Sequence, residues 1–152
     1  SLDEKEIKGG ILFYGKGRCS ACHNGPLFSD LDFHLVIFPQ TGFGKNGFGV
    51  DYGRFNVTNK VNDLYKFRTP PLIEVENTAP YGHSGSSYDL DEAIVAHFDP
   101  FRFVNFENMN AMERTEYFRT IQQVSNKTQV PYLDELEIEN LVSFLKTLSF
   151  IE

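Results

Sequence analysis

Apolar residues recur at helical spacing in four segments of this chain, which predicts four α-helices. The predicted helices cover residues 3–14, 90–98, 111–124 and 135–149. The last has the clearest apolar stripe, which consists of Ile138, Leu141, Val142, Leu145 and Leu148. Two of the helices begin with a pair of carboxylates at capping-box spacing, Asp89 with Glu92 and Asp134 with Glu137.

The other two predicted helices each place apolar residues on one face. In residues 3–14 this face consists of Ile7, Ile11 and Tyr14. In residues 111–124, which follow Asn110, it consists of Tyr117, Phe118, Ile121 and Val124.

Between the first two helices lies a long segment, residues 24–88, that is rich in Gly, Pro, Asn and aromatic residues and lacks strand alternation. So long an irregular stretch is uncommon in a compact domain. It becomes reasonable if the chain wraps a large group that supplies part of the core. The pattern therefore predicts an all-α domain around a bound cofactor.

Composition and charge narrow the function further. The 152 residues fit one domain, with 41% hydrophobic and 23% charged residues, as in soluble globular proteins. A net charge of −7 argues against nucleic acid as a partner and favours a basic protein partner. No apolar run reaches about 18 residues, so we expect no membrane span. The polar start, Ser1-Leu2-Asp3-Glu4, suggests a mature chain or an excised domain.

The motif Cys19-x-x-Cys22-His23 is the covalent attachment signature of haem c. Each thiol can add to one porphyrin vinyl group, and the adjoining histidine can bind the iron from the proximal side. A disulfide would leave His23 without a role. A zinc site needs a second pair of ligands at close spacing, and a thioredoxin-like redox couple needs a βαβ context. The motif therefore favours one covalent haem, with redox and zinc chemistry as alternatives.

The iron then needs a sixth ligand or an open face. Candidate ligands are Met109, Met112, His34, His83, His97 and several tyrosines. His97 follows Leu90, Ala93 and Ile94 at helical spacing, which places it on the buried face of the predicted helix. The alternative for His97 is a packed core histidine; His34 is left unassigned.

Three further segments carry a family resemblance. They are Tyr65-Lys66-Phe67-Arg68-Thr69-Pro70-Pro71-Leu72, then Asn77-Thr78-Ala79-Pro80-Tyr81-Gly82-His83-Ser84-Gly85, and Leu90-Asp91-Glu92-Ala93-Ile94. Together with the haem motif they resemble the carboxy-terminal haem domain of the bacterial diheme cytochrome c peroxidases. That superfamily includes the methylamine-utilisation diheme enzyme. The resemblance covers nearly the whole chain.

The resemblance implies roles for individual residues. In this family the distal haem ligand lies fourteen residues beyond the histidine that corresponds to His83, and here that position is His97. The family residue is Met in typical peroxidases and Tyr in the methylamine enzyme, so His97 departs from the pattern. Thr78 and Pro80 match positions whose backbone carbonyls bind calcium. Arg68 is placed to pair with a haem propionate, and His83 to lie near the haem without binding the iron.

The predicted fold is a single all-α, class I cytochrome c-like domain covering residues 1–152. The resemblance implies a periplasmic or outer-cell-surface peroxidase in which this domain takes electrons from a small donor protein. It passes them to a peroxidatic haem in an amino-terminal domain of the same protein, which could be a homodimer. The alternatives are a standalone electron-transfer cytochrome and a diheme enzyme that oxidises a protein substrate.

Overall fold

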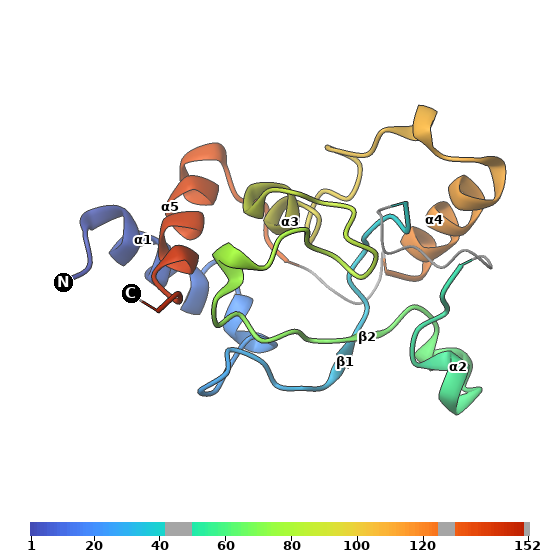
Figure 1. Ribbon diagram of the computed structural model, residues 1–152, viewed down its shortest axis with the longest axis horizontal. Coiled ribbons are helices and arrows are strands. Elements are labelled where there is room, and N and C mark those ends of the chain that lie inside the picture. Colours follow the sequence, from blue (N-terminus) through green and yellow to red (C-terminus); the bar gives the residue numbers. More distant parts are fainter. Residues whose placement is uncertain (42–49, 125–129, 151–152) are drawn as a thin grey trace. The chain divides into compact units, whose positions relative to one another are not determined.

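The computed structural model describes residues 1–41, 50–124 and 130–150, and Figure 1 shows their course. Contacts along the chain divide it into two compact units. The first unit comprises Ser1–Asp32, Thr69–Ala79 and Val130–Glu152. The second comprises Phe33–Arg68 and Pro80–Gln129.

The first unit is built on a pair of packed helices, α1 (Glu4–Tyr14) and α5 (Glu135–Lys146) (Figure 1). Both begin with a complete capping box, formed by Asp3 with Glu6 and by Asp134 with Glu137. The box predicted at Asp134 is confirmed, whereas the one at Asp3 was not identified from the sequence. Two short 3₁₀ turns complete the unit, η1 (Cys19–Ala21) and η3 (Val75–Asn77).

The contact between α1 and α5 depends on a glycine. A Cβ atom on Gly9 would lie 2.0 Å from the carbonyl oxygen of Asn140 and 2.7 Å from Cβ of Phe144. The absence of a side chain therefore lets the two helix backbones approach closely. Beside this point the buried ring of Phe13 packs against Phe144, with ring centroids 5.2 Å apart.

This close contact also decides which face of α1 is buried. The helix itself is as predicted, but the apolar residues that indicated it, Ile7, Ile11 and Tyr14, are exposed, Ile11 by as much as 67%. Gly9 and Phe13 are the buried positions of the helix. On this side of α1 the two helix backbones come into contact. A search of the sequence for large apolar residues does not detect such a contact.

The second unit joins short elements around a two-stranded antiparallel sheet, in which Phe33 pairs with Arg68 and His34 with Phe67. Its strands are β1 (Phe33–His34) and β2 (Phe67–Arg68). Its helical elements are α2 (Phe55–Thr58), η2 (Val61–Asp63), α3 (Leu90–Val95), η4 (Phe106–Asn108) and α4 (Ala111–Val124). The fold is thus helix-rich with one small sheet, where the sequence predicts helices alone.

Helix α4 begins and ends where the sequence predicts, and Asn110 and Glu113 cap its first turn reciprocally. The apolar residues of this helix differ in how far they are buried. Tyr117 is buried in a cluster with Ile37 and Met109, and Ile121 packs against that cluster. Phe118 instead lies near the surface, stacked on Phe106.

Helix α3 is shorter than predicted, because it ends at Val95 and the chain continues as a turn. Its predicted capping box does not form: the Asp89 side chain makes no capping hydrogen bond, and Glu92 accepts from the backbone N–H of Tyr88. Leu90 and Val95 are its buried residues. Among the described residues, no helix combines the length and the apolar composition needed to cross a bilayer.

Replacing Gly9→Ala should destabilise the protein by about 1–3 kcal/mol, because the new methyl group collides with the α5 backbone. Gly10→Ala is the matched control in the same helix. Its added Cβ meets the Phe144 ring at 3.4 Å, so the better helix propensity of Ala should leave stability unchanged or raise it by up to ~1 kcal/mol. Denaturant unfolding of both variants checks this, and equal midpoints for the two would contradict the close helix contact.

Candidate functional site

The segment that carries the two cysteines follows α1 directly. The backbone N–H of Gly17 donates to Leu12 at 2.8 Å, and Arg18 then takes a left-handed conformation with φ of 55°. Cys19 opens the 3₁₀ turn η1, and its carbonyl accepts from the N–H groups of Cys22 and His23. One turn of chain therefore holds both thiols and the histidine together, within the first unit.

The His23 ring has a defined orientation. Its Nδ1 atom lies 3.0 Å from the backbone carbonyl oxygen of Phe28, to which a protonated Nδ1 donates. Such a bond assigns the proton to Nδ1 and leaves Nε2 with the lone pair that a metal needs. Phe28 is itself anchored, since its ring packs against buried Phe13 with centroids 5.8 Å apart. The α1 core thus supports the orientation of the histidine.

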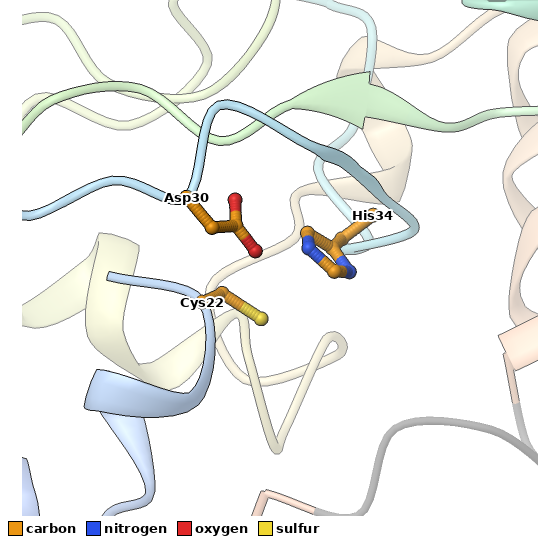
Figure 2. A group of neighbouring side chains, drawn as sticks. All are labelled: Cys22, Asp30 and His34. Atoms are coloured by element: carbon orange, nitrogen blue, oxygen red, sulfur yellow. The ribbon is translucent and has the colours of Figure 1, made fainter. Parts of the chain in front are cut away.

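Both cysteines are half-buried free thiols. Burial raises the pKa of Cys19 to about 11. Burial also raises the pKa of Cys22, assisted by the negative charges of Asp30 and Asp32. Figure 2 shows Cys22 and Asp30, whose backbones are joined by a 2.8 Å hydrogen bond from the Asp30 N–H. A redox couple requires a lowered thiol pKa, so this environment argues against the thioredoxin-like alternative.

The loop beyond the histidine is tied to the segment that starts at Thr69. The buried hydroxyl of Ser29 donates to the Thr69 carbonyl at 2.8 Å and accepts from the N–H of Leu31. The N–H of Leu72 donates to the Leu27 carbonyl at 3.2 Å. These bonds connect the haem motif to the Thr69-Pro70-Pro71-Leu72 run within the first unit.

The predicted distal ligand, His97, belongs to the second unit and lies just beyond α3. Its Nδ1 donates to the carbonyl of Ala93 at 2.8 Å. Its ring and that of Phe38 pack in a T-shaped arrangement with centroids 5.9 Å apart. Burial lowers the pKa of His97, which favours the neutral imidazole. Neutral imidazole with a protonated Nδ1 is the form that binds iron through Nε2.

The two methionines, which are the other candidate ligands, differ sharply in environment. Met109 is buried in the apolar cluster of Ile37 and Tyr117, where packing alone accounts for it. Met112 lies at the start of α4 with 63% of its surface exposed. Of these three candidates, His97 is the one whose Nδ1 is engaged by a backbone carbonyl, and its role as distal ligand stays a prediction.

His83 is held by two contacts in the second unit. Its Nε2 lies 2.9 Å from a carboxylate oxygen of Asp51, and its ring stacks on Phe67 with centroids 3.7 Å apart. Asp51 is fixed in turn by two hydrogen bonds between its backbone and the Gln40 side chain. Sequence reasoning missed Asp51, although Asp51-x-Gly53 is a recognisable turn in which the carboxylate accepts from the Gly53 N–H.

The remaining predicted site residues lie in three different places. Arg68 is exposed on β2, opposite Phe33. Thr78 ends η3 in the first unit, where its hydroxyl donates to the Val75 carbonyl at 3.1 Å. Pro80 begins the next segment of the second unit. Each of these roles stays a prediction from the resemblance.

The donor set fits a covalent haem. In the first unit, two neighbouring thiols and a histidine whose Nδ1 is engaged are the groups that thioether attachment and one bond from imidazole to iron require.

Comparisons with known proteins agree with this chemistry, although no family model matches the chain. The chain is 32% identical over its whole length to cytochrome-c peroxidase IdrP1 of Denitromonas iodatirespirans, of which it covers 42%. It is 41% identical over 97 residues to cytochrome c551 peroxidase of Pseudomonas aeruginosa, a match covering 62% of the chain and 27% of that protein. The chain thus spans less than half the length of these curated relatives.

Comparisons with solved structures agree with the sequence matches. A MauG-like protein associated with microbial copper homeostasis matches 98% of the chain and 45% of that protein, with a TM-score of 0.72 and 26% identity. The diheme peroxidase BthA from Burkholderia thailandensis shares the fold over 98% of the chain and 43% of its own, with a TM-score of 0.70 and 21% identity. These matches confirm the predicted resemblance: the chain is similar in sequence to cytochrome c peroxidases and to MauG, and it shares the fold of a diheme peroxidase.

Proposed function

We propose that this chain is the carboxy-terminal, electron-transfer haem domain of a diheme cytochrome c peroxidase, with a class I cytochrome c-like fold. One observation carries the proposal: both thiols of the Cys19-x-x-Cys22 turn lie beside a histidine whose Nδ1 is bound to the Phe28 carbonyl. That arrangement prepares the segment for covalent attachment and for ligation through Nε2. Haem c, once bound, supplies a one-electron redox centre.

The residues of the chain have separate roles in this proposal. Cys19 and Cys22 would hold the haem, because each S–H group can add across one vinyl group to form a thioether bond. His23 and His97 would supply the two imidazole ligands of its iron. With both imidazoles bound, the iron would have no open coordination position for peroxide. The domain therefore relays electrons, and the reduction of peroxide to water belongs to the other haem.

Histidine in place of the family methionine has an electronic consequence. A Met ligand raises the potential of a haem c iron, so His97 should give a lower potential than a His/Met haem has. The Ala93 carbonyl strengthens this effect, since a hydrogen bond at Nδ1 makes the imidazole a better donor.

Other residues are assigned by the resemblance. His83, held by Asp51 and Phe67, is a rigid neighbour of the haem pocket. Arg68 pairs with a propionate, and the backbone carbonyls of Thr78 and Pro80 bind calcium. Carbonyl oxygens suit that hard cation.

At the level of the whole protein, we propose a periplasmic or cell-surface peroxidase. A small donor protein delivers electrons to this domain, and an amino-terminal haem domain of the same protein receives them. The net charge of −7 favours a donor with a basic surface. The protein could act as a homodimer.

Two alternatives remain. The first, which the resemblance implies, is a diheme enzyme that oxidises a protein substrate; the chain is 33% identical to MauG over 91 residues. The second is a standalone electron-transfer cytochrome. A second C-x-x-C-H motif upstream in the gene supports either diheme reading, and its absence would support the standalone cytochrome.

Covalent attachment predicts that the protein, matured with its haem-attachment machinery, has a mass equal to the polypeptide plus one haem for this motif. The adduct should survive acid extraction, because thioether bonds do not exchange. A Cys19→Ala, Cys22→Ala double variant should lose the adduct. Intact mass spectrometry checks both, and a bare polypeptide mass in the wild type would exclude the cytochrome assignment.

Replacing His97→Ala should convert the ferric iron of this domain from low spin toward high spin. Added imidazole should then restore the low-spin absorption spectrum by occupying the vacated position. Met109→Leu is the matched control, because it preserves packing and should leave the spectrum unchanged. An unchanged low-spin spectrum in His97→Ala would show that another residue is the ligand.

A further inference from the structure

Tyr65 is a buried tyrosine whose hydroxyl group has an ionisable partner. Only 2% of the residue is exposed, and its hydroxyl donates to Oε2 of Glu116 in α4. The two residues are 51 positions apart in the sequence, and both belong to the second unit. The backbone N–H of Tyr65 is bound to the Tyr52 carbonyl at 3.0 Å, which fixes the position of the ring further.

The carboxylate of Glu116 is held in place on its other side. Its second oxygen, Oε1, forms an ion pair with the guanidinium of Arg119, one turn further along α4. The Glu116 side chain is only 12% exposed, whereas that of Arg119 is 54% exposed, so the carboxylate is mostly buried and its cationic partner lies at the surface. A hollow of the same unit is lined by Tyr65, Glu113 and Glu116, among other residues, which gives water access to the carboxylate.

This geometry bears directly on oxidation of the ring. Burial raises the pKa of Tyr65, and the hydrogen bond and negative charge of Glu116 raise it further, so the phenol stays protonated at neutral pH. A protonated phenol loses an electron readily only when its proton departs at the same time. A carboxylate already hydrogen-bonded to the hydroxyl is positioned to accept that proton.

Tyr117 offers a contrast within the same unit. It is buried to a similar degree, 5% exposed, and its hydroxyl donates to the backbone carbonyl of Pro100. A peptide carbonyl accepts a hydrogen bond but does not take up the proton at neutral pH. The two buried tyrosines thus differ in whether the hydrogen-bond acceptor of the hydroxyl can take up its proton.

A second aromatic ring connects Tyr65 to the surface. The Tyr52 ring lies 5.7 Å from that of Tyr65 between centroids, and Tyr52 is 37% exposed. Phe55 packs on Tyr52 in turn, with centroids 6.3 Å apart. An electron lost from Tyr65 can therefore be replaced through a ring in contact with solvent.

We propose that Tyr65 is a one-electron donor site with Glu116 as its internal proton acceptor. The electron passes to a one-electron outer-sphere oxidant, which is reduced. The O–H bond of Tyr65 breaks, its proton moves to Oε2 of Glu116, and the products are a neutral phenoxyl radical and a carboxylic acid. The site goes beyond haem relay, because it adds a redox group made of side chains alone.

Photochemical oxidation of the matured protein by flash-generated tris(bipyridine)ruthenium(III) tests the site. Freeze-quenched samples are analysed by electron paramagnetic resonance, with ring-deuterated tyrosine to identify the radical. Exposed tyrosines depend on buffer as the base, whereas Tyr65 does not. Wild type and Tyr117→Phe should therefore both give a tyrosyl radical whose rate of formation is independent of buffer concentration. Tyr65→Phe should lose that component.

Glu116→Gln should slow the same component by about 100-fold, the contribution expected of a positioned base, because an amide accepts the hydrogen bond but not the proton. High-field resonance of the wild-type radical provides a test without substitution, since a protonated Glu116 should remain hydrogen-bonded to the phenoxyl oxygen. A buffer-independent radical that persists in Tyr65→Phe, a wild-type rate in Glu116→Gln, or a radical without that hydrogen bond overturns the proposal. No peroxide is used, so failure of the peroxidase assignment would leave this result unaffected.

Discussion

The hydrogen bond between His23 Nδ1 and the Phe28 carbonyl is the contact on which the rest of the account depends. It determines which ring nitrogen carries the proton, and hence which one can bind iron. The bond is possible because Phe28 packs on Phe13, which is buried beside the close crossing of α1 and α5. The close helix contact at Gly9, the packing of Phe13 and Phe28, and the orientation of the His23 ring are therefore connected.

The second unit has the same kind of hydrogen bond at His97, whose Nδ1 is bound to the Ala93 carbonyl. In both histidines a backbone carbonyl engages the nitrogen that does not bind metal. If both histidines bind one iron, as we propose, its ligands stay in place when its charge changes, and little then has to move during electron transfer. An open position for peroxide requires the opposite arrangement, with one ligand absent or readily released.

Local sequence signals predicted local structure well. The Cys19-x-x-Cys22-His23 spacing indicated the attachment segment, and the Asp134 box with the apolar stripe of α5 indicated that helix. The apolar spacing in α1 indicated a helix but not its buried face, because backbone proximity at Gly9, and not side-chain size, decides its orientation. The capping box predicted at Asp89 does not form, because the Glu92 side chain accepts a hydrogen bond from the Tyr88 N–H instead.

Pairs that are distant in the sequence could not be predicted at all. Asp51 with His83, and Tyr65 with Glu116, meet only through the fold of the second unit. No spacing rule connects such positions in a single sequence. The role of His97 was predicted from helical spacing and from the resemblance, and those of Arg68, Thr78 and Pro80 from the resemblance alone.

Steady-state reduction of peroxide, with electrons supplied by a reduced small cytochrome, tests the central claim most directly. The measurement compares the wild-type full-length protein with a Cys19→Ser, Cys22→Ser variant that retains its other haem. If this domain relays electrons, the variant should lose turnover while the spectrum of the remaining haem is unchanged. Turnover at the wild-type rate without a haem in this domain would contradict the account.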